Sequence, residues 1–124
     1  MSQDKRTVVF VDDSESIREA VGFILQQNGY EVLKAGDGEE SLKYFDGSQV
    51  DLLITDLHMP QMNGIALIET LRKTSQYKYL PILVLTTESQ FEQKMEAKRA
   101  GATGWVVKPF TPEKLMAIIR RVIH

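Results

Sequence analysis

The chain has 124 residues, of which 43% are hydrophobic, and a formal net charge of −2 at pH 7. This length suits one domain with a buried core, and the near-balanced charge argues against the concentrated basic surface that nucleic-acid binding normally needs. Cysteine is absent, which excludes disulfides and thiolate metal sites, and because there is neither a signal peptide nor an apolar run of roughly 18 residues we expect a soluble, cytoplasmic protein.

Short apolar runs and helical patterns alternate along the chain. The first run, TVVFV at residues 7–11, is rich in β-branched residues, and the segment after it repeats apolar residues at spacings of three and four, as one face of a helix does. The same alternation continues to the end of the chain. In chain order, the expected strand and helix pairs are residues 7–11 and 14–27, 31–35 and 38–45, 52–55 and 65–73, 82–85 and 91–100, and 104–107 and 111–122.

Residues with strong capping preferences stand at several helix ends. Ser14 precedes the first helix and Asn63 the third, and Thr111 followed by Pro112 opens the last one. Gly101 closes the fourth helix, since glycine tolerates the left-handed backbone of a C-terminal cap. Local sequence therefore supports the helix ends that the periodicity indicates.

Five strand–helix units in strict alternation predict parallel strands joined by right-handed crossovers. The runs at 7–11, 52–55 and 82–85 are almost entirely apolar, as expected for strands that are covered on both faces. The second strand is expected at a sheet edge. We therefore predict an α/β fold, a doubly wound five-stranded parallel sheet with five helices, forming a single domain over residues 1–124.

Polar residues follow the strands where these end, and in an open parallel sheet the carboxyl ends meet where ligands bind. The residues expected to converge there are three carboxylates, two hydroxyls and one ammonium group: Asp12, Asp13, Asp56, Thr86, Thr87 and Lys108. Three neighbouring carboxylates repel one another, and Mg²⁺, which prefers oxygen ligands and often binds carboxylates together with phosphate, would offset that repulsion. Aspartate can also accept a phosphoryl group as a nucleophile, and Asp56 is our candidate for this role.

Four motifs resemble those of the receiver domains of two-component response regulators, in particular stand-alone receivers of the chemotaxis-regulator type. They are Asp12-Asp13-Ser14, the run ITDLHMPQMNG at residues 54–64, Leu85-Thr86-Thr87 and Lys108-Pro109-Phe110. Each motif is weak alone, but all four occur in the expected order, each at a strand end. One departure is Asn63, where many receivers carry aspartate. The resemblance implies the flavodoxin-like receiver fold over about residues 7–122.

The resemblance also implies a phosphorelay signalling function. Asp56 would accept a phosphoryl group from a phosphohistidine on a sensor histidine kinase or a phosphotransfer protein. Mg²⁺ would bind Asp13, Asp56 and the backbone carbonyl of His58, with Asp12 acting mainly through a coordinated water. Such a domain catalyses its own phosphorylation and dephosphorylation and is not an enzyme that turns over a separate substrate.

Further roles follow from the same resemblance. Thr86 would be the switch hydroxyl that moves to the phosphate, Lys108 would contact the phosphoryl oxygens, and backbone amides near Leu57 and Thr87 would complete the oxyanion contacts. The Lys108–Pro109 peptide is expected to be cis. His58 and Glu88 hold the two positions at which the family tunes dephosphorylation.

The output surface of such a receiver would comprise the fourth helix, the fifth strand and the fifth helix. Its expected members are Phe91, Lys94, Met95, Lys98, Trp105 and Val107. Apolar residues with basic neighbours suit a partner helix or a phosphotransfer bundle, and no nucleic-acid or membrane partner is expected. Trp105 either swings inward when Thr86 moves or is a packed strand residue. Because the sequence ends at His124, we expect output through another protein, either a flagellar motor switch or a phosphorelay member.

Each assignment has a plainer alternative. Asp12 and Asp13 alone also fit helix capping, and Asp56 fits a turn. Thr86 and Thr87 also fit strand-end hydroxyls that bond to the backbone, and Lys108 fits a solvated side chain. The main functional alternative is a phosphorylation-independent interaction module, although such receivers usually lack a site residue and none is missing here. A third hypothesis is a metal-dependent phosphohydrolase, which would need an aspartate at the position of His58.

Overall fold

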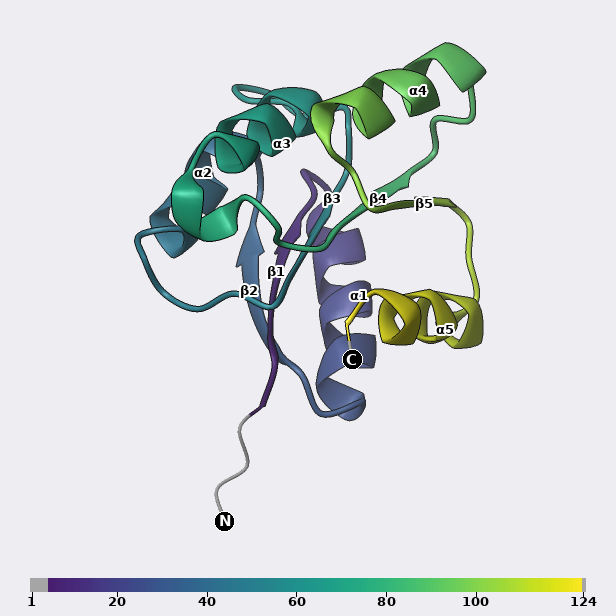
Figure 1. The fold of residues 1–124 in the computed structure, drawn as a ribbon. Helices are drawn as coiled ribbons and strands as arrows, with labels where there is room; N and C mark the ends of the chain where they lie inside the picture. The colour runs from purple at the N-terminus through teal and green to yellow at the C-terminus, as the bar shows by residue number, and fades with distance from the viewer. Residues whose placement is uncertain (1–4, 124) are drawn as a thin grey trace.

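Five parallel strands form one sheet in the computed structural model of the chain, which describes residues 5–123 (Figure 1). The strands are β1 (Thr7–Val11), β2 (Glu31–Ala35), β3 (Leu52–Thr55), β4 (Ile82–Thr86) and β5 (Gly104–Val107). Their order in the sheet is β2-β1-β3-β4-β5, and every neighbouring pair is parallel. The predicted doubly wound α/β fold is therefore confirmed, and β2 lies at an edge as expected.

The helices agree closely with the capping residues in the sequence. They are α1 (Glu15–Gln27), α2 (Gly38–Ser41), α3 (Gly64–Arg72), α4 (Phe91–Ala100) and α5 (Pro112–Val122). The side chains of Ser14, Asn63 and Thr111 each accept a hydrogen bond from a first-turn backbone N–H of the helix that follows. Gly101 ends α4 with a left-handed φ of 119°.

The second helix differs from the sequence prediction. In place of one helix over residues 38–45, α2 has four residues and continues as a 3₁₀ helix at Leu42–Tyr44. The Tyr44 hydroxyl donates to the Lys34 carbonyl over 2.8 Å, and the Phe45 ring packs edge-on against Tyr77 with centroids 5.1 Å apart. These tertiary contacts hold the segment in the tighter turn, which periodicity does not reveal. A second 3₁₀ helix, Ser75–Tyr77, was not predicted either.

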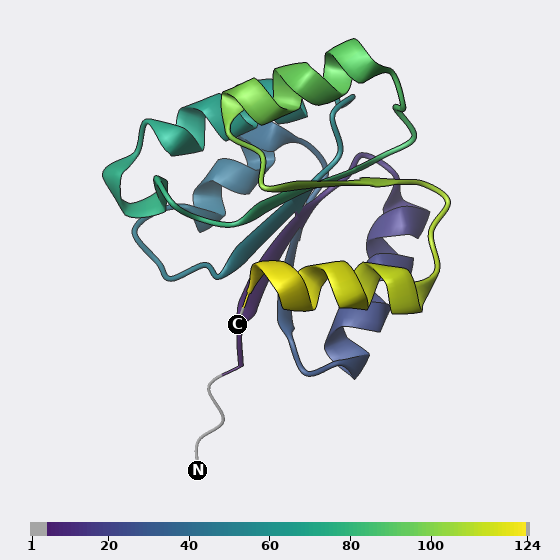
Figure 2. The same ribbon diagram turned by 45° about the vertical axis from the view of Figure 1, so that its right-hand side comes forward.

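The helices cover both faces of the sheet, α1 and α5 on one side and α2, α3 and α4 on the other (Figures 1 and 2). Each face has its own hydrophobic core. Val8, Phe10 and Ile54 pack with residues of α1 and α5, whereas the alternate strand residues Val9 and Leu53 pack on the side of α3 and α4. Burial on both faces explains why the central strands are apolar throughout.

The predicted domain span of 1–124 includes residues 1–4 and His124, which lie outside the described residues. Within residues 5–123, no helix is long and apolar enough to cross a membrane. The cytoplasmic location stays a prediction.

Candidate phosphorylation and metal site

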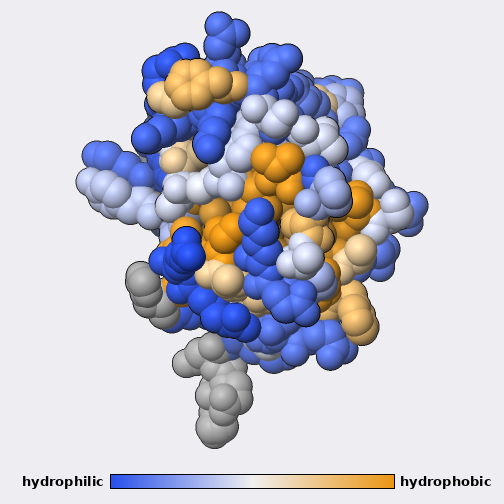
Figure 3. All heavy atoms as spheres, turned by 90° about the vertical axis from the view of Figure 1, so that its right-hand side faces the viewer, coloured by the Kyte–Doolittle hydropathy of each residue, from blue (hydrophilic) through white to orange (hydrophobic). Residues whose placement is uncertain are grey.

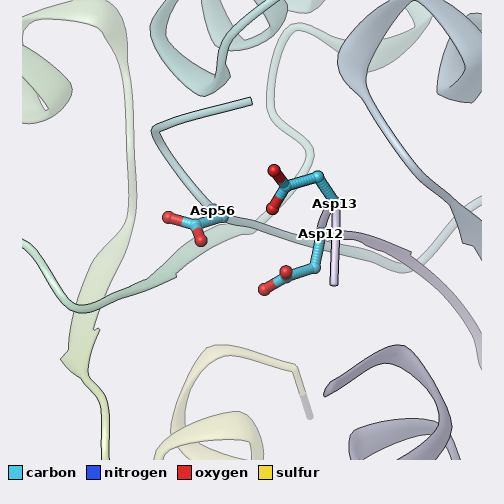
Figure 4. Close-up of side chains that lie close together, drawn as sticks. All are labelled: Asp12, Asp13 and Asp56. Atoms are coloured by element: carbon cyan, nitrogen blue, oxygen red, sulfur yellow. The ribbon is translucent and has the colours of Figure 1, made fainter. Parts of the chain in front are cut away.

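The ends of β1 and β3 bring three carboxylates together. Val11 and Thr55 are register partners in the sheet, so the residues that follow them, Asp12 and Asp56, emerge side by side. One carboxylate oxygen from each of Asp12, Asp13 and Asp56 lies within 4.8 Å of the others (Figure 4). Asp12 and Asp56 are buried and Asp13 is exposed, so the cluster opens to solvent on the Asp13 side.

Asp12 is held through all three of its oxygen atoms. Its Oδ1 accepts from the Ser14 backbone N–H at 3.0 Å, and its Oδ2 accepts from Lys108 Nζ at 2.6 Å. The backbone carbonyl accepts from Arg18 Nη1 at 2.6 Å. Both carboxylate oxygens and the backbone carbonyl of Asp12 therefore have protein donors. Asp13, in contrast, makes no hydrogen bond with another described residue.

The backbone around Asp56 is equally constrained. Its Oδ1 accepts from the Leu57 N–H at 2.6 Å, its Oδ2 from Lys108 at 3.1 Å, and its carbonyl from the Thr55 hydroxyl at 2.8 Å. The first residue of α3, Gly64, approaches so closely that a Cβ there would lie 2.2 Å from the Asp56 carbonyl oxygen. Only glycine fits at this position without moving the backbone of Asp56.

Lys108 reaches the cluster from the end of β5. Its backbone N–H donates to the Thr86 carbonyl at 2.8 Å, and the peptide to Pro109 is cis, as expected. Burial alone would lower the pKa of the Lys108 ammonium, but the hydrogen bonds and charges of Asp12 and Asp56 outweigh burial and raise that pKa above its ordinary value. Lys108 is therefore a permanent cation between two carboxylates at neutral pH.

The donor set suits a hard divalent cation. Three carboxylates face one ammonium group, so negative charge remains in excess, and the accessible carboxylate of Asp13 has no protein partner among the described residues. Mg²⁺ prefers oxygen ligands and binds through one or two carboxylates with waters and phosphate. The residues present fit such an ion.

The sequence and fold both match one known family. Residues 8–120 match the family described as "Response regulator receiver domain". The chain belongs to this family. The stand-alone, chemotaxis-type resemblance is supported by individual receivers, because a structure of chemotaxis protein CheY4 from Vibrio cholerae is 48% identical with a TM-score of 0.92, covering 96% of this chain and 99% of that one.

Curated relatives include both short and long proteins. Chemotaxis protein CheY1 of Helicobacter pylori is 39% identical over 110 residues, which are 87% of this chain and 89% of that protein. The probable transcriptional regulator ycf27 of Porphyridium aerugineum is 37% identical over 120 residues, which are 97% of this chain but 49% of that protein. The chain thus spans about half the length of some of its curated relatives.

The remaining predicted residues of the receiver site make no side-chain hydrogen bond to the three carboxylates among the described residues. Thr86 is buried at the end of β4, and its hydroxyl accepts from the Glu88 N–H at 3.2 Å. Thr87 is exposed. The exposed His58 ring pairs with Glu88 at 3.1 Å, and the Gln90 N–H together with His58 holds the pKa of the Glu88 carboxyl below its usual range. The β3–α3 and β4–α4 loops are thereby linked.

Trp105 lies on β5, half-buried, on the same side of the sheet as Thr86. It is the register partner of Val84, two residues before Thr86, and side chains two apart on a strand share a face. It also lines a hollow of about 410 Å³ between α4 and β5. The other predicted output residues that line this hollow are Phe91, Lys94, Met95 and Lys98. Figure 3 views this side of the molecule and shows an apolar area bordered by polar residues.

Sequence reasoning missed one contributor to the receiver site. Arg18 lies on the first helix and looks like an ordinary exposed residue of an amphipathic helix, yet its guanidinium holds the Asp12 carbonyl. Its position four residues after the cap Ser14, on the turn that faces the acidic strand end, is the only sequence signal that could have suggested this contact.

Proposed function

We propose that this receiver accepts a phosphoryl group on Asp56 from a phosphohistidine of a sensor histidine kinase or phosphotransfer protein, and that phosphorylation changes its binding to a partner protein. The observation that carries the proposal is the surrounding of the Asp56 carboxylate. One oxygen is oriented by the Leu57 amide and the other by Lys108, beside two further carboxylates of a hydrophilic cluster.

The transfer itself needs alignment and charge neutralisation more than covalent chemistry from the protein. A carboxylate oxygen of Asp56 attacks phosphorus, the P–N bond to the donor imidazole breaks, and the imidazole nitrogen keeps the electron pair. Lys108, which the carboxylates keep charged, then pairs with the phosphoryl oxygens. The Leu57 amide is positioned to donate to the same group.

Mg²⁺, held by Asp13 and Asp56 with the His58 carbonyl, would supply the positive charge that lets a phosphate approach three carboxylates. Lys108 lies closer to Asp12, at 2.6 Å, than to Asp56, at 3.1 Å, which favours Asp12 as the main partner of Lys108 and an indirect role for Asp12 toward the metal. In this proposal Asp12 orients the Lys108 ammonium group, and Asp13 offers a carboxylate that is free to bind the metal.

Switching is proposed to run from Thr86 to Trp105. The Thr86 hydroxyl now accepts from the Glu88 amide, and turning toward a phosphate on Asp56 would give up that bond. Space vacated on that face of the sheet would be open to Trp105, whose rotation would reshape the hollow against α4. The basic residues Lys94 and Lys98 beside apolar Phe91 favour a partner helix that carries acidic and apolar side chains. The chemotaxis relatives favour a motility partner over a phosphorelay member.

The test uses Trp105, the only tryptophan, as its reporter. Addition of Mg²⁺ and then beryllofluoride, a phosphoryl mimic, should change its fluorescence in a saturable way, and Asp56→Asn should abolish the response to beryllofluoride. Intact-mass analysis after treatment with acetyl phosphate should show one phosphoryl adduct on the wild type and none on Asp56→Asn. Full labelling of Asp56→Asn would contradict the assignment, and no labelling of the wild type would favour the phosphorylation-independent module.

A further inference from the structure

The loop between β3 and α3, residues 57–63, carries backbone groups on which the proposed reaction depends. It provides the Leu57 amide beside Asp56 and the His58 carbonyl expected to bind Mg²⁺. A hydrogen bond from the Gly64 N–H to the Leu57 carbonyl, 3.0 Å, closes the loop upon itself. That bond defines the shape of the loop but not its position relative to Asp12 and Asp13.

Among the described residues, two hydrogen bonds tie this loop to elements other than β3 and α3. One joins the side chains of His58 and Glu88, and the His58 side chain is 59% exposed. The other is a backbone bond, in which the Gly38 N–H donates to the Met62 carbonyl over 3.0 Å. A backbone bond at a buried residue cannot be lost by side-chain rotation, so Gly38 is the more rigid of the two anchors.

Gly38 touches the loop where no side chain would fit. A Cβ at this position would lie 2.7 Å from the Met62 carbonyl oxygen and 2.9 Å from Met62 Cγ. The carbonyl oxygen cannot rotate out of the way without moving the loop backbone.

The α2 side of this contact is held in place by its own bonds. Asp37 caps α2 by accepting from the Glu40 N–H at 2.8 Å, the Ser41 hydroxyl donates to the Gly38 carbonyl at 2.7 Å, and the Gly36 N–H donates to Glu40 at 2.7 Å. Added bulk at position 38 would therefore displace the loop before it displaces the start of α2.

We propose that Gly38 is a positioning residue for the phosphorylation site. Its contact with Met62 sets where the β3–α3 loop lies, and thereby where the Leu57 amide and His58 carbonyl stand relative to the carboxylates. This inference rests on the proposed function for its functional readouts, although the loop position itself can be measured without metal or phosphate.

The first variant is Gly38→Ala, with Gly22→Ala as a matched control. Both add one methyl group to a buried helical glycine, and alanine is the better helix former at either place. A Cβ at Gly22 would meet Lys34 Cε at 2.7 Å, which is the end of a flexible side chain and can turn aside. Gly22 lies in α1, away from the β3–α3 loop.

In the metal-free full chain, Gly38→Ala should shift the backbone amide NMR signals of Leu57 and His58, and Gly22→Ala should leave them in place. The Mg²⁺ dissociation constant of Gly38→Ala should rise about tenfold, the size typical for loss of an outer partner of a metal site, and labelling by acetyl phosphate should slow. Unchanged Leu57 and His58 signals with wild-type Mg²⁺ affinity in a folded Gly38→Ala would overturn the proposal.

A measurement on the wild type covers the case in which Gly38→Ala fails to fold. If Gly38 positions the loop, then filling the site must stabilise the Gly38–Met62 bond in return, because coupling between two sites is reciprocal. Hydrogen exchange of the Gly38 amide should therefore slow when Mg²⁺ and beryllofluoride are added. Equal exchange rates with and without them, in protein that binds both, would refute the positioning role. If the wild type binds neither, the proposed function fails, and the metal-free amide signals still decide the role of Gly38.

Discussion

Lys108 Nζ donates a hydrogen bond to Asp12 Oδ2 over 2.6 Å, although the two residues are 96 positions apart. Two other strands, β3 and β4, separate β1 from β5 in the sheet, so this bond reaches across the carboxyl ends of both. Asp56 lies between the two strand ends and shares the same ammonium. Asp56, the proposed phosphoacceptor, therefore shares its Lys108 partner with Asp12, and this Asp12–Lys108–Asp56 bridge joins residues from distant parts of the chain.

Replacing Lys108 with methionine tests this bridge. The change should lower the free energy of unfolding at pH 7 without Mg²⁺ by roughly 3 kcal/mol, since removing one partner leaves buried charges without a counterion. Urea denaturation followed by circular dichroism measures the effect. Lys34→Met is the control, because Lys34 pairs with the mostly exposed Glu19 at 3.4 Å, and such surface pairs contribute less than about 1 kcal/mol. Equal losses in the two variants would contradict the bridge.

Above neutral pH, the contribution of Lys108 should persist until the solution is strongly alkaline. Its pKa is raised above the ordinary value of 10.5 in the folded chain. A cation with a raised folded-state pKa stabilises fully below its unfolded-state pKa and loses that effect as the pH rises through the folded-state value. The stability difference between wild type and Lys108→Met should thus stay constant from neutral pH to about 10 and shrink above 10.5. A decline that begins below pH 9 would argue against this assignment.

Asp12 and Asp13 should respond differently to the same substitution. Asp13→Asn removes a free carboxylate, so we expect Mg²⁺ affinity to fall at least tenfold while stability stays equal or rises through relief of repulsion. Asp12→Asn removes a charge-assisted partner of Lys108 and should reduce stability in the absence of Mg²⁺. Fluorescence titration of Trp105 and thermal denaturation separate the two effects. Indistinguishable variants would mean that the burial of Asp12 has no energetic consequence.

Arg72 should matter for stability and not for phosphorylation. Its guanidinium donates to the carbonyls of Gly101, Tyr77 and Lys78, joining the end of α3 to the α4–β5 turn. Arg72→Met should cost about 2 kcal/mol, because carbonyls that lie under the guanidinium lose a charged donor. Labelling with acetyl phosphate should proceed at the wild-type rate per folded molecule, and a slower rate would indicate coupling to the site.

Gln61 offers a gain of stability within the β3–α3 loop. It has a positive φ of 64°, a conformation that asparagine tolerates better than glutamine. Gln61→Asn should therefore raise the free energy of unfolding by about 0.5 kcal/mol, whereas Gln61→Val should lower it. Denaturant midpoints compare the three proteins. If valine is tolerated as well as asparagine, the backbone of this residue must relax at little cost.

Sequence patterns predicted most of this fold because the information is local. The apolar runs stop at polar residues, and Ser14, Asn63 and Thr111 cap helices in the structure as their identities favour. The end of the 38–45 segment could not be predicted, because distant partners of Tyr44 and Phe45 decide it.

For the site, the polar residues that follow the strands predicted that three carboxylates and Lys108 lie close together, but not which atoms form hydrogen bonds. That Lys108 contacts both Asp12 and Asp56 depends on the assembled sheet, and the contacts of Arg18 and Gly38 use backbone partners that leave no side-chain signature. The assigned roles in metal binding, transfer and switching stay predictions.

The pairing of Val11 with Thr55 has a consequence for how the protein tolerates insertions. Side chains alternate between the faces of a strand, so one residue inserted or deleted within β1 would either carry Asp12 away from Asp56 or exchange the inward and outward sets of the strand. Length changes in β1 or β3 should therefore separate the carboxylates of Asp12, Asp13 and Asp56. Length changes before the start of a strand, such as in the exposed segment 46–49 that precedes β3, should leave this alignment unchanged. The proposed Mg²⁺ binding, once measured for the wild type, would serve as an assay for correct strand alignment in insertion libraries of this chain.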